Sequence, residues 1–391
     1  MSEHAQPESD RWALATTHSR FLARLLTVRP ELPEMLAPWS SRPLDAAAMR
    51  GLLGPLDDAD EAALGLALRR LRQAVMAQVI VRDLADGAPL AEIVGTMTTL
   101  AELSVNAALG LLHRQLAAQY GEPLDSRGRP QKLIVIGMGK LGGRELNVSS
   151  DIDLIFVYPE DGETAGPQVI DAYDFFFRLG KRLIGIISDI TEAGQVFRVD
   201  MRLRPDGDSG PLVLPLDALE NYLIAQGREW ERYAWIKSRV LNEGDNAQAD
   251  WIAALQGTTH PFIFRKYLDY GAINAMRDLH VQIRREVARK EMATHVKLGP
   301  GGIREIEFIA QVFQLIRGGR DATLRSRPTL KVLGLLVERR LLPAETREEL
   351  VAAYDFLRRV EHRLQYFEDA QTHQLPSTDA DCEMLARSMG M

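Results

Sequence analysis

The chain has 391 residues, 46% of them hydrophobic and 26% charged, with a formal net charge of −7. This balance is typical of a globular protein with two or three cores, and the acidic charge argues against a nucleic-acid binder. A single cysteine, Cys382, excludes a disulfide framework, and we expect it to be buried. The sequence has neither an apolar run of membrane-spanning length nor a signal peptide. We therefore expect a cytoplasmic protein that does not bind membranes.

Residues 1–125 are predicted to form an N-terminal helical region. Leu64, Leu68, Leu71 and Val75 recur at three- and four-residue steps, which is the spacing of one buried helix face. This part of the sequence has neither a glycine-rich loop nor an acidic constellation. We therefore interpret it as packing scaffold.

A small α/β unit is predicted for residues 126–216, after the turn-forming string SRGRP. An apolar face made largely of phenylalanine and leucine suits its helix for covering a sheet. The predicted elements are strands at 132–136, 151–158 and 195–204, a helix at about 168–189, and a short apolar run at 212–214.

A glycine-rich loop links the first two predicted strands and ends at two acidic residues. Asp151 and Asp153 are two positions apart, so in a strand their side chains share one face about 7 Å apart along the chain. Such carboxylates repel each other unless a cation lies between them, and hard oxygen ligands suit Mg²⁺. Glycines let backbone N–H groups approach an anion closely. The pattern predicts a site for a metal ion and a nucleotide.

The predicted strand at 195–204 alternates apolar and polar residues. Its polar face carries Arg198, Asp200, Arg202 and Arg204. A third carboxylate would complete a two-metal site for displacement at phosphorus, and arginine binds phosphate through two parallel hydrogen bonds. The alternative is a solvated strand face with ordinary Asp–Arg pairs.

Longer strings carry a family resemblance. GMGKLGGRELNVSSDIDLIFVY, VFRVDMRLRPDGDSGPLV, KLGPGGIREIEFIAQ and LRRVEHRLQYFEDAQTHQLP resemble the nucleotidyltransferase superfamily. Within it, they resemble the N-terminal, adenylyl-removing half of the bifunctional glutamine synthetase adenylyltransferase/adenylyl-removing enzymes. The resemblance extends from about residue 131 to the end of the sequence. It implies an α+β, mostly helical fold with a small polymerase-β-like mixed sheet.

The resemblance also implies roles for particular residues. Asp151, Asp153 and Asp200 would be catalytic and would bind Mg²⁺. Glutamine synthetase would be the substrate protein and the PII signal protein a regulatory partner, with ADP, AMP and inorganic phosphate as substrates or products. The residues expected to bind nucleotide or phosphate are Gly137, Gly139, Lys140, Ser149, Ser150, Arg202 and Arg204.

Residues 217–391 are predicted to be helical only. Trp230, Tyr233 and Trp235 suit either base stacking or core packing. His362 and His373 lack partners at metal-ligand spacing and are predicted to be structural. The chain is expected to be part of a longer protein with a second, related half.

A second glycine loop, at 297–302, precedes a predicted helix. The free N–H groups of a helix start bind anions, while the alternative is a tight turn between helices. An orientation of Arg304 or Glu305 toward the carboxylates would favour a functional role. Arg232 and Lys237 are further candidates for contacting phosphate.

The preferred hypothesis is phosphorolysis, in which phosphate removes AMP from a tyrosine of glutamine synthetase and ADP is released. One alternative is adenylyl transfer from ATP to the same protein, because the sister half has the same aspartate pattern. The other is a non-catalytic regulatory module that binds glutamine synthetase or PII. The presence of all three aspartates argues against that module.

Overall fold

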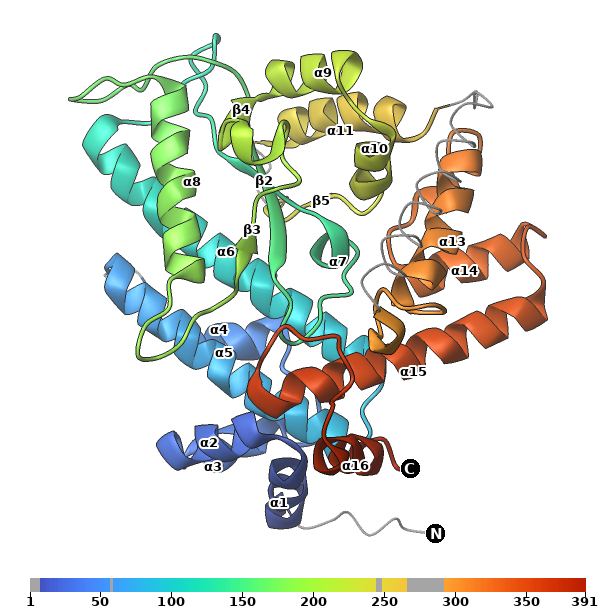
Figure 1. Ribbon diagram of the computed structural model, residues 1–391. Helices are drawn as coiled ribbons and strands as arrows, with labels where there is room; N and C mark the ends of the chain where they lie inside the picture. The colour runs from blue at the N-terminus through green and yellow to red at the C-terminus, as the bar shows by residue number, and fades with distance from the viewer. Residues whose placement is uncertain (1–7, 57–58, 244–247, 266–291) are drawn as a thin grey trace.

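The structure is a computed structural model that describes residues 8–56, 59–243, 248–265 and 292–391. One small sheet lies at the centre, and helices from both ends of the chain surround it (Figure 1). The expected fold class, mostly helical with a small mixed sheet, is confirmed. Among the described residues, no helix is both long and apolar enough to cross a membrane.

The N-terminal helices form a layer behind the sheet, dominated by the long helices α5 and α6 (Figure 1). Several begin at a side chain that caps the free N–H groups of the first turn, including Ser19, Asp45 and Asp60. Buried leucine, valine and alanine residues of α5 and α6 form the main core. The helices are α1 (Glu8–His18), α2 (Arg20–Val28), α3 (Leu32–Leu36), α4 (Ala46–Leu53), α5 (Glu61–Leu84) and α6 (Leu90–Tyr120).

Within the described residues the sheet has five strands, with β2 at its centre. β2 pairs antiparallel with β1, which pairs antiparallel with β5. Along its other edge, β2 pairs in parallel first with β3 and then with β4. The strands are β1 (Ile134–Gly137), β2 (Ile152–Tyr158), β3 (Val199–Asp200), β4 (Val213–Pro215) and β5 (Arg239–Val240).

Both faces of the sheet are buried, so β1 and β2 are almost continuously apolar. On one face Val135, Leu154 and Phe156 pack in the core formed with α5, α6 and α8 (Ala172–Ser188). On the other, Ile136 and Ile155 pack in a second core with α9 (Leu216–Ala225), α10 (Glu229–Trp235) and α11 (Ala249–Ile263). The alternation of a strand thus divides these residues between two cores.

The C-terminal helices lie beside the sheet, and α15 returns to the N-terminal layer (Figure 1). Arg363 and Tyr366 of α15 both donate hydrogen bonds to the buried Asp83 of α5. Arg72 of α5 binds both oxygens of Asp369 at 2.7 Å. These helices are α13 (Ile303–Arg317), α14 (Thr329–Glu338), α15 (Ala344–Glu368) and α16 (Asp379–Ser388).

Three sequence predictions were wrong. Of the strand expected at 195–204, only the two residues of β3 form a strand. The backbone N–H of Arg202 bonds to the Asp200 carboxylate and that of Arg204 to the Met201 carbonyl, and these local bonds turn the chain. Residues beyond 217 were expected to be helical only, yet they supply β5. Cys382 is exposed on α16, where its thiol donates to the Pro376 carbonyl. The division of the chain at residues 125 and 216 stays a prediction.

Gly142 ends the short helix α7 (Gly139–Gly142), and the segment just before β5 passes close to it. A Cβ atom built on Gly142 would lie 1.8 Å from the Lys237 carbonyl oxygen and 2.5 Å from that of Gly137. Both are backbone atoms, so the contact cannot be relieved by a change of rotamer. The glycine is required for the strand and the loop to approach each other.

We expect Gly142→Ala to lower the free energy of unfolding by about 3 kcal/mol, because backbone must move to accept the methyl group. Gly334→Ala in α14 is the matched control, since its Cβ would meet nothing within 4 Å. An alanine there should stabilise the helix by about 0.5–1 kcal/mol. Urea unfolding measures both changes, and equal stabilities for the two variants would contradict the close approach.

Candidate active site

Three carboxylates converge at the edge between β2 and β3. The parallel register places Asp153 directly beside Asp200, on strands about 4.8 Å apart, and Asp151 lies just before β2. Burial, with the charges of Asp151 and Asp200, raises the pKa of Asp153 to about 7. Gly139, with a φ of +55°, brings the loop close enough that a Cβ there would lie 3.0 Å from an Asp153 oxygen.

Two of these carboxylates have protein partners. Arg202 binds both Asp200 oxygens through Nε at 2.9 and 3.0 Å and lowers the pKa of Asp200. Gln371 donates to Asp151 at 2.9 Å. Among the described residues, no three His, Cys, Asp or Glu side chains are arranged to hold a metal ion.

The donor set still fits a hard cation. All three groups supply carboxylate oxygens, which Mg²⁺ prefers, and burial together with the charges of Asp151 and Asp200 disfavours the ionised form of Asp153 when no cation is bound. The Arg202 side chain is 71% exposed, so it is free to leave Asp200 for solvent. Asp153 and Asp151 are therefore suited to bind a metal as they stand, and Asp200 is suited once Arg202 moves.

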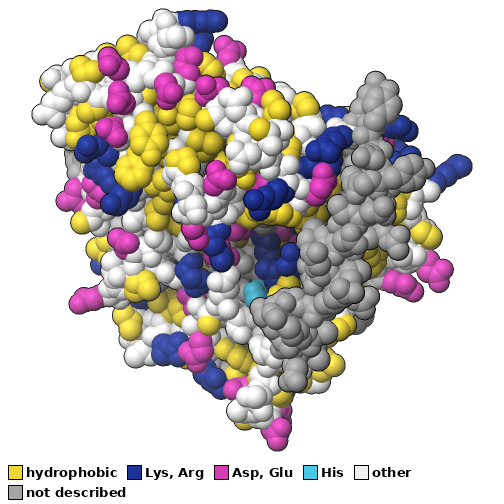
Figure 2. Space-filling view, turned by 45° about the horizontal axis from the view of Figure 1, so that its top comes forward, with side chains coloured by type: hydrophobic (Ala, Val, Ile, Leu, Met, Phe, Trp, Pro, Cys, Tyr) yellow, Lys and Arg dark blue, Asp and Glu magenta, His cyan; other side chains and the backbone are white. Residues whose placement is uncertain are grey.

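A cavity of about 370 Å³ lies in front of the carboxylates. This volume falls within the usual range for small-molecule sites. In Figure 2, Lys and Arg side chains gather around a central hollow in which acidic side chains are also visible. The charged residues that line the cavity are Asp151, Asp153, Glu307, Lys140, Lys237, Lys297 and Arg304.

The lining cations fall into two groups. Lys140 pairs with Glu361 at 2.9 Å, and burial lowers its pKa to about 8. Lys237 pairs with Glu145 at 2.7 Å and with Glu307 at 3.2 Å. Lys297 and Arg304, by contrast, have no ion-pair partner within the part of the chain that the structure describes. They are the cations free to bind a substrate anion.

The glycine loop at 297–302 contributes side chains to the cavity. Arg304 lies in the first turn of α13, and its N–H bonds to the Lys297 carbonyl at 3.0 Å. The N–H groups of Gly302 and Ile303 bond to loop carbonyls as well. The anion site expected from free backbone groups is therefore not formed by these N–H groups, but Arg304 lines the same cavity as Asp151 and Asp153, which favours a functional role.

The three aromatic candidates separate. Trp230, 40% exposed, and Tyr233 line the cavity. Trp235 is buried in the core with α9 and α11. Trp230 is therefore the residue best placed to stack on a base, and Trp235 has a packing role.

Several predicted phosphate ligands are engaged elsewhere. The Ser149 hydroxyl bonds to Asp369 at 2.5 Å and is buried. Arg204 donates to the carbonyls of Met201 and Gly210, which fastens the loop after β3. Arg232 donates to the carbonyls of Phe262 and Ile263. Gly137 is the last residue of β1 and pairs with Leu154 of β2, and Ser150 lies in the cavity wall.

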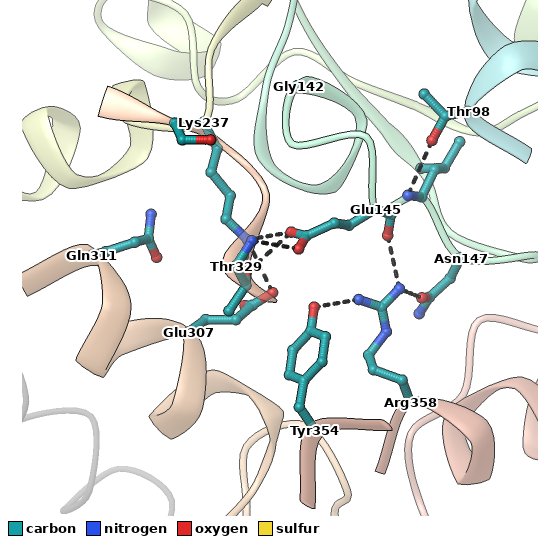
Figure 3. Close-up of polar contacts among 12 residues, drawn as sticks. Thr98, Gly142, Glu145, Asn147, Lys237, Glu307, Gln311, Thr329, Tyr354 and Arg358 are labelled. Carbon is teal, nitrogen blue, oxygen red and sulfur yellow. Dashed lines mark hydrogen bonds and ion pairs between the residues drawn. The ribbon is translucent and has the colours of Figure 1, made fainter. Parts of the chain in front are cut away.

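Sequence reasoning missed that α15 holds the loop between β1 and β2. Arg358 donates to the Glu145 carbonyl at 2.7 Å and to the Asn147 side chain (Figure 3). Gln365 accepts from the Ser149 N–H at 3.1 Å. The available signal was the i, i+3, i+7 spacing of Arg358, Glu361 and Gln365, which places them on one helix face. The buried His362 lies on the same helix, 3.3 Å from the Asn147 side-chain oxygen, and its structural role stays a prediction.

A small mixed sheet with clustered carboxylates beside a glycine loop is the arrangement of a nucleotidyltransferase. A family model described as glutamate-ammonia ligase adenylyltransferase matches residues 11–253, and one described as GlnD PII-uridylyltransferase matches residues 277–391. The chain therefore belongs to the glutamate-ammonia ligase adenylyltransferase family.

The chain is similar to several proteins named bifunctional glutamine synthetase adenylyltransferase/adenylyl-removing enzyme. That of Aromatoleum aromaticum is 58% identical over 389 residues, which cover 100% of this chain and 41% of the relative. That of Chromobacterium violaceum is 57% identical over 374 residues, covering 95% and 41%. That of Neisseria meningitidis is 49% identical over 385 residues, covering 97% and 42%. The chain thus spans about two fifths of the length of these relatives.

We expect Asp153→Asn to stabilise the protein at pH 8 and to lose this advantage toward pH 4. Native Asp153 holds its proton up to about pH 7, whereas the unfolded chain releases it near the ordinary value of 3.8. The contribution of Asp153 to stability is therefore present below pH 4 and lost as the pH rises to 7. Thermal unfolding with EDTA at pH 4.5, 6 and 8 measures the difference.

Asp321→Asn is the matched control with the opposite sign. Hydrogen bonds from Thr323 and Arg339 hold the pKa of Asp321 at about 2. Its contribution is therefore present above pH 4, and the asparagine variant should be less stable than wild type at neutral pH. A pH-independent effect of Asp153→Asn would contradict the carboxylate cluster.

We expect Arg358→Met to lower the free energy of unfolding by about 3–5 kcal/mol, because it leaves buried acceptors unpaired. Arg387→Met on α16 is the control. Arg387 is 67% exposed in an i, i+4 pair with Glu383, so its loss should change stability by less than about 0.5 kcal/mol. Urea unfolding tests both, and equal effects would show that α15 does not anchor the loop.

Proposed function

We propose that this chain removes AMP from an adenylylated tyrosine of glutamine synthetase by phosphorolysis, giving ADP and unmodified glutamine synthetase. The observation that carries the proposal is that one cavity brings Asp151 and Asp153 together with Lys297 and Arg304, two cations that have no ion-pair partner among the described residues. The names of the similar proteins support glutamine synthetase as the substrate protein. In this proposal the protein acts in the cytoplasm, with PII as a regulatory partner.

Asp151, Asp153 and Asp200 are the residues that would hold Mg²⁺. When bound, the metal supplies positive charge that offsets the charge building up on the transferred phosphoryl group. When no metal is bound, the guanidinium group of Arg202 neutralises the Asp200 carboxylate. Trp230 stacks on the adenine base at the mouth of the cavity.

The two free cations hold the incoming phosphate. Two unit charges 4 Å apart repel by about 4 kcal/mol at an effective dielectric constant of 20, so an anionic nucleophile needs cations to approach an anionic phosphodiester. Lys297 and Arg304 supply them. An oxygen of phosphate forms a bond to the phosphorus of AMP, and the bond from that phosphorus to the tyrosine oxygen breaks. The tyrosine leaves with the electron pair and then takes up a proton, which is favourable because the phenol pKa is about 10.

This assignment differs from the sequence-based choice of Arg202 and Arg204. Arg204 is held in the turn after β3, and the cavity wall includes neither arginine. Arg202 reaches substrate only after it leaves Asp200. Lys140 contributes positive charge to the cavity while paired with Glu361.

We expect release of ADP from adenylylated glutamine synthetase to require added inorganic phosphate and to proceed without ATP. Adenylylation of unmodified glutamine synthetase with ATP at a comparable rate would favour the transferase alternative. Binding of glutamine synthetase or PII without either reaction would favour the regulatory module. Asp153→Asn should abolish ADP formation in this assay.

We expect Arg304→Gln to raise the phosphate concentration for half-maximal rate by about tenfold or more, because a charge-assisted hydrogen bond to phosphate is lost. The value for adenylylated glutamine synthetase should change much less. Arg317→Gln, an exposed arginine in the last turn of the same helix, is the control and should alter neither value. A larger effect from Arg202→Ala than from Arg304→Gln would indicate that phosphate binds at the edge of β3 instead.

A further inference from the structure

We propose that the chain has a second anion site, separate from the catalytic cavity, that binds a small oxyanion. A cavity of about 30 Å³ lies behind β5 and is lined by Arg239, Arg325, Arg327 and His260. It shares no lining residue with the catalytic cavity. A single water needs roughly 10–15 Å³ by this measure, so the cavity admits a compact ion and excludes a nucleotide.

The three arginines are fixed in place by backbone carbonyls. Arg239 donates to the carbonyls of Leu141 and Gly142. Arg325 donates to the Gly318 carbonyl at 2.8 Å and lies 5.3 Å from the centre of the Phe264 ring. Arg327 donates to the Ser238 carbonyl. The guanidinium groups are therefore preorganised around the cavity.

Their charges are poorly compensated. Arg239 pairs with Glu102, but Arg325 and Arg327 form no ion pair with any described carboxylate. The one carboxylate in the lining, that of Glu243, belongs to an exposed residue. Burial and the nearby charge of Arg239 lower the pKa of Arg327, against a smaller opposing effect of Glu243.

His260 shows the same excess of positive charge. Burial, with Arg325 and Arg327, lowers its pKa and disfavours a fourth cation in the cluster. An oxyanion would relieve the repulsion between the arginines, and the planar guanidinium fork matches phosphate and carboxylate oxygens. The ligand is thus a compact phosphate-like or carboxylate anion.

The site shares a wall with the catalytic side of the molecule. Lys237 and Thr329 belong to the buried polar network, where they bond to each other at 2.9 Å (Figure 3). Arg239 lies two residues after Lys237, and Arg327 lies two residues before Thr329. Both arginines line the small cavity, and Arg327 donates to the carbonyl of Ser238, which lies between Lys237 and Arg239. An anion bound by Arg239 and Arg327 would hold these two segments together on the side away from the catalytic cavity. The anion would therefore act as an effector and not as a reactant.

Calorimetric titration at constant ionic strength tests the site. We expect inorganic phosphate and sulfate to bind the Arg304→Gln variant, in which the proposed phosphate contact of the catalytic cavity is removed. Arg327→Gln in that background should weaken binding by about tenfold or more, because a charge-assisted contact is lost. Arg339→Gln is the control, since Arg339 is a half-exposed surface residue paired with Asp321, and it should bind as before. Tighter binding of acetate than of phosphate would identify the ligand as a carboxylate.

Arg325→Gln is the second variant, because loss of the Arg327 bond to Ser238 can disturb the fold. Its thermal unfolding and circular dichroism should match the wild type while phosphate and sulfate bind about tenfold or more weakly. Unchanged binding in both the Arg325 and Arg327 variants would overturn the proposal. So would loss of all binding in Arg304→Gln, because the anion would then lie in the catalytic cavity.

Discussion

The candidate active site depends on the buried polar face of α15. The loop from β1 to β2 carries the glycines and leads to the aspartates, yet α7 is its only regular element, at residues 139–142. Glu361 fixes Lys140, Arg358 fixes the chain at Glu145 and Asn147, and Gln365 fixes Ser149. Removal of one partner from a buried charged pair of this kind is strongly destabilising. The loop therefore takes its shape from a helix more than 200 residues away in sequence.

Packing between distant segments also brings carboxylates and free cations into one cavity. Its carboxylates Asp151 and Asp153 come from the start of β2, and its free cations come from the loop before α13 and the first turn of that helix. Neither part has the complete chemistry of a phosphoryl-transfer site by itself. The packing of α13, α14 and α15 beside the sheet brings the two sides together, and the pairs of Lys237 with Glu145 and Glu307 connect them directly.

Local patterns in the sequence predicted the features that local geometry determines. The apolar runs of β1 and β2 and the amphipathic helix α8 follow from period, and the pairing of Asp151 with Asp153 follows from their spacing. β5 was not predicted because two residues are too few to show a period. The strand at 195–204 was predicted too long because alternation cannot reveal that Asp200 caps its own turn.

The rest of the site was beyond single-sequence reasoning for a physical reason. Apolar spacing predicts which helix face is buried, but a charged residue is buried only where a partner compensates it. The partners of Arg358 and Glu361 lie in the β1–β2 loop, and no period relates the two segments. The assignment of Arg204 failed in the same way, because its carbonyl partners become available only in the folded turn.

The contacts between α5 and α15 also constrain the order in which the chain can fold during synthesis. Asp83 and Arg72 are buried in the finished protein, and their partners are Arg363, Tyr366 and Asp369. A ribosome delivers the N-terminal helices first, so these two charges emerge long before anything can neutralise them. Burying them alone would be strongly unfavourable. The N-terminal layer must therefore stay hydrated on that side until α15 emerges and packs against it.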